Sequence, residues 1–152
     1  MILINKSPTA DTRTCDVSKV TKEQLLDSSK MHIKDVESGM FYFANKLTQQ
    51  SKKHDFDKIE NINEFFIDFK NNFETHSWLD NHKRVNRHHL NNEDGVPEDV
   101  NLLDVLEYLT DCVMAGLARS GEVYDITIDN ETLQKAFANT VNILKDNVQV
   151  LS

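Results

Sequence analysis

The residues of this sequence that could bind a metal are concentrated between positions 32 and 111. All six histidines fall in that stretch. Imidazole nitrogens and carboxylate oxygens are the ligands that borderline divalent metals prefer. One histidine, His76, fits no position in the set, and we expect it at the surface. The candidate ligands, in chain order, are His32, His54, Asp55, His82, His88, His89 and Asp111.

Ligands of these types suit the hydrolysis of a phosphate ester. Such a hydrolase must form a nucleophile at neutral pH and neutralise charge on the phosphoryl oxygens, and one or two divalent ions do both. We expect Asp55 to be essential for catalysis, because a carboxylate next to a ligand histidine can bridge two ions. The expected ligand sets are His32, His54, Asp55 and Asp111 for the first ion, and His82 with one or both of His88 and His89 for the second.

Several charged side chains near these ligands are candidates for supporting roles. We expect Lys58 to take part in catalysis as a cation, and Glu107 to orient a ligand histidine by a hydrogen bond. Asp104, two helical turns before Asp111, is expected at the pocket rim or on the surface. The candidates for holding a substrate phosphate are Arg84, Arg87 and Arg119.

Each of these residues also has a purely structural interpretation. A histidine at a helix edge, such as His32, is more often hydrogen-bonded than metal-bound. The pairs His54-Asp55 and His88-His89 could each be ordinary solvated residues. What favours a metal site is that all of them occur together in one order.

The elements that must position these residues are predicted to be helices. Four glycines and two prolines in 152 residues are few, which favours helices over a turn-rich sheet. Thr21 and Gln24 form a capping-box pattern, which predicts that a helix starts there. A long helix to about Ser51 follows, and its buried face is expected to be Ile33, Val36, Met40, Phe43, Ala44 and Leu47.

The same apolar spacing predicts further helices over 59–73 and 100–117, and a last helix capped by Asn130. Residues 91–97 are predicted to form a loop, and 123–128 a short strand or an extended link. The predicted fold class is an all-α helical bundle with at most a short strand pair. An extended arm over 1–20, with a possible edge strand at 2–4, would precede one domain over 21–152.

Composition excludes several classes of function. A net charge of −8 argues against long nucleic acid, which needs clustered Lys and Arg. Two cysteines do not make a disulfide framework. Neither a membrane span nor a signal-peptide core is predicted, so we expect a cytoplasmic protein.

The order of ligands resembles the HD-domain metal-dependent phosphohydrolases, which are named for a His-Asp pair such as His54-Asp55. The later histidines resemble the binuclear branch, in which they hold a second metal. His54-Asp55-x-x-Lys58 is similar to that branch's His-Asp-x-x-Lys motif, and His88-His89 to the His-His-Glu of HD-GYP phosphodiesterases. Leu90 stands in place of the Glu.

A closer resemblance is to small, uncharacterised HD-like proteins of phages and bacteria, and the chain resembles a phage-encoded member acting in the host cytoplasm. The resemblance covers about residues 32 to 145 and implies an all-helical bundle around the metal site. Its shared elements are His54-Asp55-x-x-Lys58, His82-x-Arg84-x-Asn86-Arg87-His88-His89, Glu107-x-x-x-Asp111 and Asn139-Thr140.

These observations predict a metal-dependent phosphohydrolase that uses one or two divalent ions of Mn, Fe, Ni, Co, Zn or Mg. The expected substrate is a small nucleotide, either a nucleoside monophosphate or a cyclic nucleotide. The alternative is a non-catalytic HD-like module that keeps its metal and binds a nucleotide or a protein partner. Intact ligands and nearby cations favour the enzyme.

Overall fold

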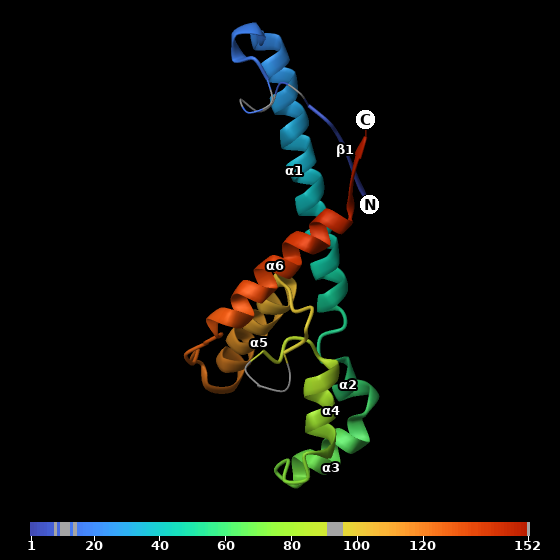
Figure 1. Ribbon diagram of the computed structural model, residues 1–152. Helices are drawn as coiled ribbons and strands as arrows, with labels where there is room; N and C mark the ends of the chain where they lie inside the picture. Colours follow the sequence, from blue (N-terminus) through green and yellow to red (C-terminus); the bar gives the residue numbers. More distant parts are fainter. Residues whose placement is uncertain (8, 10–12, 14, 91–95, 152) are drawn as a thin grey trace. The chain divides into compact units, whose positions relative to one another are not determined.

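The computed structural model describes residues 1–7, 9, 13, 15–90 and 96–151. The chain forms two compact units, one of Met1–Lys46 with Asn142–Ser152 and the other of Leu47–Val141. Within the described residues the fold is mostly helical with one two-stranded sheet (Figure 1), which confirms the predicted fold class. Parts of the predicted arm and most of the predicted loop over 91–97 lie outside the described residues.

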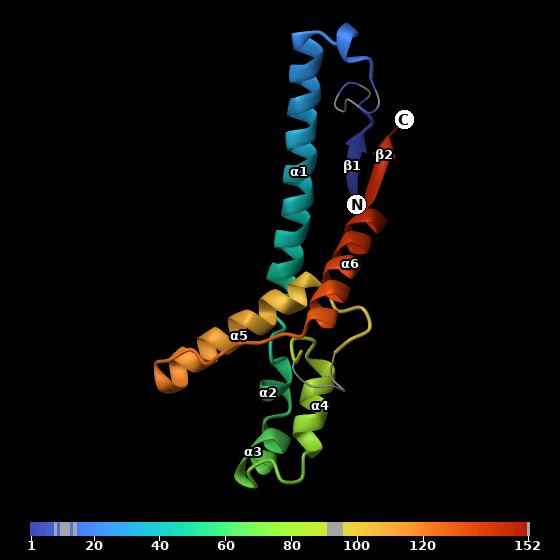
Figure 2. The same ribbon diagram turned by 60° about the vertical axis from the view of Figure 1, so that its left-hand side comes forward.

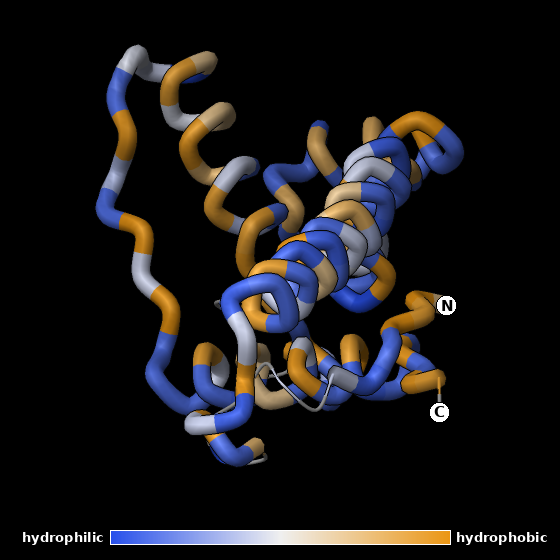
Figure 3. Tube along the Cα trace, turned by 90° about the horizontal axis from the view of Figure 1, so that it is seen from above, coloured by the Kyte–Doolittle hydropathy of each residue, from blue (hydrophilic) through white to orange (hydrophobic). Residues whose placement is uncertain are grey.

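The first unit contains the sheet, which joins the two ends of the chain. Strand β1 (Ile2–Asn5) pairs in parallel with β2 (Val148–Leu151), and Figure 2 shows the two strands side by side. Hydrophobic residues lie at both ends of the chain (orange beside the N and C labels in Figure 3). The strand predicted at 2–4 is confirmed. Its partner β2 was not predicted, because no local pattern identifies a partner at the other end of the sequence.

The long helix α1 (Lys22–Ser51) begins at the predicted capping box. The Gln24 backbone N–H donates to Thr21 Oγ1 (3.2 Å), and the Thr21 N–H donates to Gln24 Oε1 (3.0 Å). A short 3₁₀ helix, η1 (Val17–Lys19), precedes it. Helix α1 is unbroken, so His32 continues it and does not open a second helix.

The face of α1 that was predicted to be buried is largely exposed. Ile33 is 67% exposed and Met40 is 66% exposed, whereas Ser28 and Gly39 are buried. A methyl group at Gly39 would lie 3.9 Å from Leu144 Cδ1 of α6 (Asn130–Asp146), so α6 packs where α1 has its smallest residue. The prediction was wrong because apolar spacing marks a face of a helix but does not say which element packs on it.

The second unit holds α2 (Phe56–Glu60), α3 (Ile62–Lys70), α4 (Ser77–Val85) and α5 (Leu102–Ser120). Its core is formed by four buried apolar residues from different segments. They are Leu90, Val100, Tyr108 and Ala136. In the region predicted as a helix over 59–73, Phe65 and Phe73 are half-buried and the other large apolar side chains are exposed.

Side-chain hydrogen bonds fix the starts of α4 and α5. Asp68 Oδ2 of α3 accepts from the backbone N–H groups of Trp78 and Leu79, both at 3.2 Å. Helix α5 has its own capping box, in which Asn101 Oδ1 accepts from Leu103 N and Asp104 Oδ2 accepts from Asn101 N.

The remaining helix ends lie close to their predicted positions. Helix α5 ends at Gly121, whose φ of 76° belongs to the left-handed region that favours glycine. The last helix starts one residue earlier than predicted, because Asp129 Oδ1 accepts from Thr132 N and Asn130 is already helical. Residues 123–128 form an extended link. None of the helices in the described residues has the length and apolar character needed to cross a membrane.

Candidate metal centre

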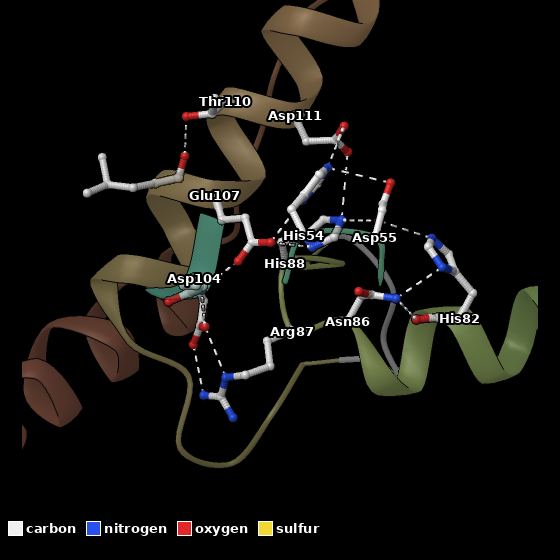
Figure 4. Close-up of polar contacts among 12 residues, drawn as sticks. His54, Asp55, His82, Asn86, Arg87, His88, Asp104, Glu107, Thr110 and Asp111 are labelled. Carbon is white, nitrogen blue, oxygen red and sulfur yellow. Dashed lines mark hydrogen bonds and ion pairs between the residues drawn. The ribbon is translucent and has the colours of Figure 1, made fainter. Parts of the chain in front are cut away.

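Two groups of potential metal ligands lie in the second unit. His54, His88 and Asp111 each offer an atom within 4.8 Å of the other two, and so do Asp55, His82 and His89. The two groups are neighbours, because the ring centroids of His54 and His88 are 4.5 Å apart and those of His88 and His89 are 4.4 Å apart. Figure 4 shows His54, Asp55, His82, His88 and Asp111 converging. The groups could hold metal ions.

Local backbone geometry explains how neighbours in sequence reach this centre. Asp55 joins the end of α1 to α2 and has a φ of 52°. This left-handed conformation is uncommon outside glycine, but aspartate tolerates it. His82 lies in the last turn of α4, and the chain then leaves the helix at Asn86, so that His88 and His89 turn back towards α5.

The Nε2 atoms of three histidines face one carboxylate. Asp55 Oδ1 is 3.5 Å from Nε2 of His82 and 3.4 Å from Nε2 of His88, and Asp55 Oδ2 is 3.5 Å from Nε2 of His54. Asp111 lies 3.6 Å from Nε2 of His54 and 3.8 Å from Nε2 of His88. Ligand atoms bound at about 2.1 Å to one ion lie roughly 3.0 to 3.4 Å apart, so these separations are only slightly wider. Asp55, a member of the second group, thus also lies next to the histidines of the first group.

Glu107 holds the other side of two of these rings. Its Oε1 atom is 2.9 Å from His54 Nδ1, the contact expected from its place one turn before Asp111. The same atom lies 3.1 Å from His88 Nδ1, and Gln50 Nε2 donates to Oε2 at 2.6 Å. A carboxylate beside Nδ1 favours the tautomer that leaves Nε2 free to bind a metal.

The carboxylate of Asp57 lies beside Nδ1 of His82, as Glu107 does for His54. Both of its carboxylate oxygens lie within 3.0 Å of His82 Nδ1, and Asn86 Nδ2 donates to Oδ1 at 2.8 Å. Asp57, His82 and Asn86 are all buried. The histidine ring is therefore fixed on one side and presents Nε2 to Asp55 on the other.

The protonation states of the centre suit metal binding. Burial, together with the neighbouring His88 and His82, lowers the pKa of His89 to about 4, so its ring is neutral at pH 7. Burial alone would raise the pKa of Glu107, but the contacts with His88, His54 and Gln50 outweigh it and lower that pKa to about 2.

Asp55 is also held as a carboxylate. Burial would raise its pKa, but the hydrogen bond from Lys58 and the charge of that ammonium group lower it below the ordinary value. Metal ligands must be deprotonated, so these shifts favour a cation.

Buried polar atoms support the same conclusion. Asp55 Oδ1, His88 Nε2 and His89 Nε2 are buried, and none of them has a hydrogen-bond partner among the described residues. Buried polar groups normally have hydrogen-bond partners. All three of these atoms are of types that bind divalent metals. The residues therefore fit a divalent ion.

One expected ligand and two expected phosphate contacts are not brought to this centre. His32 is exposed on α1 in the first unit, and it belongs to neither of the two groups, which lie in the second unit. Arg84 is exposed and donates to Asn81 at 2.7 Å. The guanidinium of Arg87 is held by Asp104 and Asp99.

The expectation for Asp104 was wrong, because this residue is fully buried. Its carboxylate accepts from Arg87 Nε and Nη2 at 3.0 and 2.9 Å and from Gln50 Nε2 at 3.0 Å. It also caps α5, as described above. Asp104 therefore connects the segment that carries His88 to the helix that carries Glu107 and Asp111.

Sequence reasoning missed Asp57 and Gln50, and gave Asn86 no role. Nothing in the sequence separates Gln50 from its neighbour Gln49. Asp57 follows Asp55 by two residues, and a second carboxylate so close to a His-Asp pair is a signal that could have been used. His76 is exposed, as predicted.

Two cavities border Asp111. One, of about 430 Å³, is lined by residues of the end of α1 and of α5, with His54 and Asp111 among them. The other, of about 270 Å³, brings Arg119 together with Asp111, Tyr124 and Asp125. Arg119 thus remains a candidate cation beside the centre, as does Lys58 beside Asp55.

Comparisons with protein-family models, with curated proteins and with solved structures found no match for this chain.

Proposed function

We propose that this chain is a metal-dependent phosphohydrolase of the HD type that acts on a small phosphate ester, with a nucleotide as the substrate class that the sequence resemblance suggests. The observation that carries the proposal is the convergence of three histidine Nε2 atoms on Asp55, at 3.4 to 3.5 Å. A divalent ion at such a site supplies a nucleophile at neutral pH and neutralises phosphoryl charge.

Partial exposure of the centre favours catalysis over a structural metal. The side chains of His54 and Asp111 are 32% and 33% exposed, and both line the larger cavity. Structural metal sites are closed by protein ligands, whereas catalytic sites keep a position open to water and substrate. The ligands proposed are His54, His88 and Asp111 for one ion, His82 and His89 for the other, and Asp55 facing both.

The remaining polar residues have distinct roles in this proposal. Glu107 and Asp57 hold the Nδ1 protons of the ligand histidines and so fix the rings. Lys58 neutralises part of the charge of Asp55 and can pair with a phosphate oxygen, and Arg119 can do so from the smaller cavity. Arg87 holds Asp104 in place and is not proposed to touch substrate.

The test is a hydrolysis screen with chelator-treated protein reloaded with Mn, Mg, Co, Ni, Fe or Zn. The panel contains nucleoside monophosphates, cyclic nucleotides, dinucleotides and aryl phosphates. Wild type should release phosphate or nucleotide, whereas Asp55→Asn should retain its fold and lose nearly all turnover. His76→Asn is the matched control, because His76 is exposed and asparagine accepts its φ of 54°.

If wild type is as inactive as Asp55→Asn with every metal, the enzyme proposal is wrong. Metal that still binds in that case, with a rise in melting temperature, would identify the non-catalytic module instead.

A further inference from the structure

The larger cavity beside the centre has an apolar wall. Leu106 and Met114 of α5, with Leu47 of α1, form this wall, and His54 and Asp111 lie at its edge. Residues 106, 110 and 114 are spaced by four, so they form one stripe along α5, next to the stripe that carries Glu107 and Asp111. A group held at the centre therefore has an apolar surface next to it.

The charges around this cavity are all negative. No Lys or Arg of the described residues lines it, and its acidic residues are Glu107 and Asp111. Apart from the proposed ion, to which Asp111 would be bound, a second phosphate or a carboxylate in the cavity would find no Lys or Arg to pair with. The candidate cations, Lys58 and Arg119, do not line it.

We propose that the substrate is a phosphate monoester whose alcohol part is uncharged and has an apolar face, and that this face lies against Leu47, Leu106 and Met114. The inference rests on the proposed function and specifies its substrate class. The cavity of about 430 Å³ is within the size range of small-molecule sites and can accept an alkyl chain or an aromatic ring. Diphosphates and acidic sugar phosphates are poor substrates.

A series of n-alkyl phosphates tests this directly, with metal-loaded wild type and phosphate release as the readout. From methyl to hexyl phosphate, kcat/KM should rise roughly fourfold per methylene until the cavity is filled. A nucleoside monophosphate should be cleaved better than the corresponding diphosphate.

Two leucines of α5 provide matched variants. Leu106 lines the cavity and is 48% exposed, whereas Leu109 is 49% exposed and does not line it. Leu106→Asp should lower the ratio of kcat/KM for hexyl over methyl phosphate by roughly tenfold or more. Leu109→Asp should leave this ratio unchanged. Metal content of both variants, measured by elemental analysis, should equal that of wild type.

The possible results separate the two proposals. Equal kcat/KM for methyl and hexyl phosphate would refute the apolar substrate and leave the proposed function standing. Failure to cleave any phosphate ester would refute both. If Leu106→Asp dissociates an oligomer seen by sedimentation and leaves the chain-length preference intact, the cavity is a contact between copies of the chain and the inference is wrong.

Discussion

Asp57 holds a ligand histidine without reaching the metal position itself. Replacing it with asparagine removes the charge opposite His82 Nδ1 but keeps the size of the side chain. We expect Asp57→Asn to weaken metal affinity by roughly 10-fold to 100-fold, because the ring loses the carboxylate that fixes its tautomer. Competition with a chromogenic chelator measures this. Asp80→Asn, an exposed change on α4, the helix that carries His82, is the control.

Glu107 has the same role for two rings at once. In Glu107→Gln one carboxylate oxygen becomes an NH2 donor. This group faces either the Gln50 amide, which is itself a donor, or the Nδ1 atoms of His54 and His88, so one of these two sets of contacts is lost. Metal affinity and turnover should each fall by roughly 10-fold to 100-fold. Glu64→Gln, on the exposed side of α3, should change neither. An unchanged Glu107→Gln protein would mean that its hydrogen bonds matter only for packing.

Asp68 links α3 to the start of α4. Its carboxylate should make the free energy of unfolding of the protein depend on pH. The hydrogen bond from Thr75, together with those from Leu79 and Trp78, holds the pKa of Asp68 below its ordinary value of 3.8. A depressed folded-state pKa stabilises the protein above the unfolded pKa, and this contribution is lost as the pH falls through the folded value.

The free energy of unfolding, measured with urea between pH 5 and pH 2, should therefore fall less steeply in Asp68→Asn than in wild type. The mutant should also be less stable at pH 5. Asp80→Asn, which removes an exposed carboxylate of α4, should keep the wild-type slope. Parallel curves for wild type and Asp68→Asn would contradict the assigned role.

Replacing two helical glycines with alanine should have opposite effects on the free energy of unfolding. A methyl group at Gly116 would lie 2.6 Å from the Glu122 carbonyl oxygen, whereas one at Gly39 would lie 3.9 Å from Leu144 Cδ1. Gly116→Ala should therefore destabilise the protein by roughly 1 to 3 kcal/mol. Gly39→Ala should be neutral or stabilising by up to about 1 kcal/mol, through the higher helix propensity of alanine. Chemical denaturation of both variants measures the difference.

Local sequence signals predicted where helices and strands lie better than they predicted which of these elements pack or pair with one another. The capping box at Thr21 depends on neighbouring residues and was predicted from them. The exposed face of α1 and the pairing of β1 with β2 depend on residues far away in the chain. Periodicity carries no information about those residues.

The same distinction holds at the candidate centre. The order of histidines and aspartates predicted six of the residues that the structure brings together, and these are His54, Asp55, His82, His88, His89 and Asp111. It could not exclude His32, because a sequence position does not show which compact unit contains the residue. Arg87 was expected at a substrate because it is a cation close to the ligands in sequence, and nothing in the sequence showed that the buried Asp104 holds it.

At the scale of the whole molecule, metal binding should appear as stability. An ion that binds the folded chain at one hundred times its Kd stabilises it by about 2.7 kcal/mol. We expect metal-loaded wild type to melt roughly 5 to 10 °C above chelator-treated protein in calorimetry. Asp55→Asn should show a much smaller shift. Equal melting temperatures with and without metal would argue that the folded chain does not bind an ion at this centre.

The stacking of Trp78 on His82 gives this chain an optical signal of its own. The two rings are 4.5 Å apart and inclined by 18°, and Trp78 is the only tryptophan in the sequence. Its fluorescence therefore comes from a single indole in contact with one ligand ring of the centre. A paramagnetic ion such as Mn²⁺ or Co²⁺ at His82 should quench that emission, whereas Zn²⁺ should not. Occupancy of this half of the centre can then be followed by spectroscopy in the unlabelled protein.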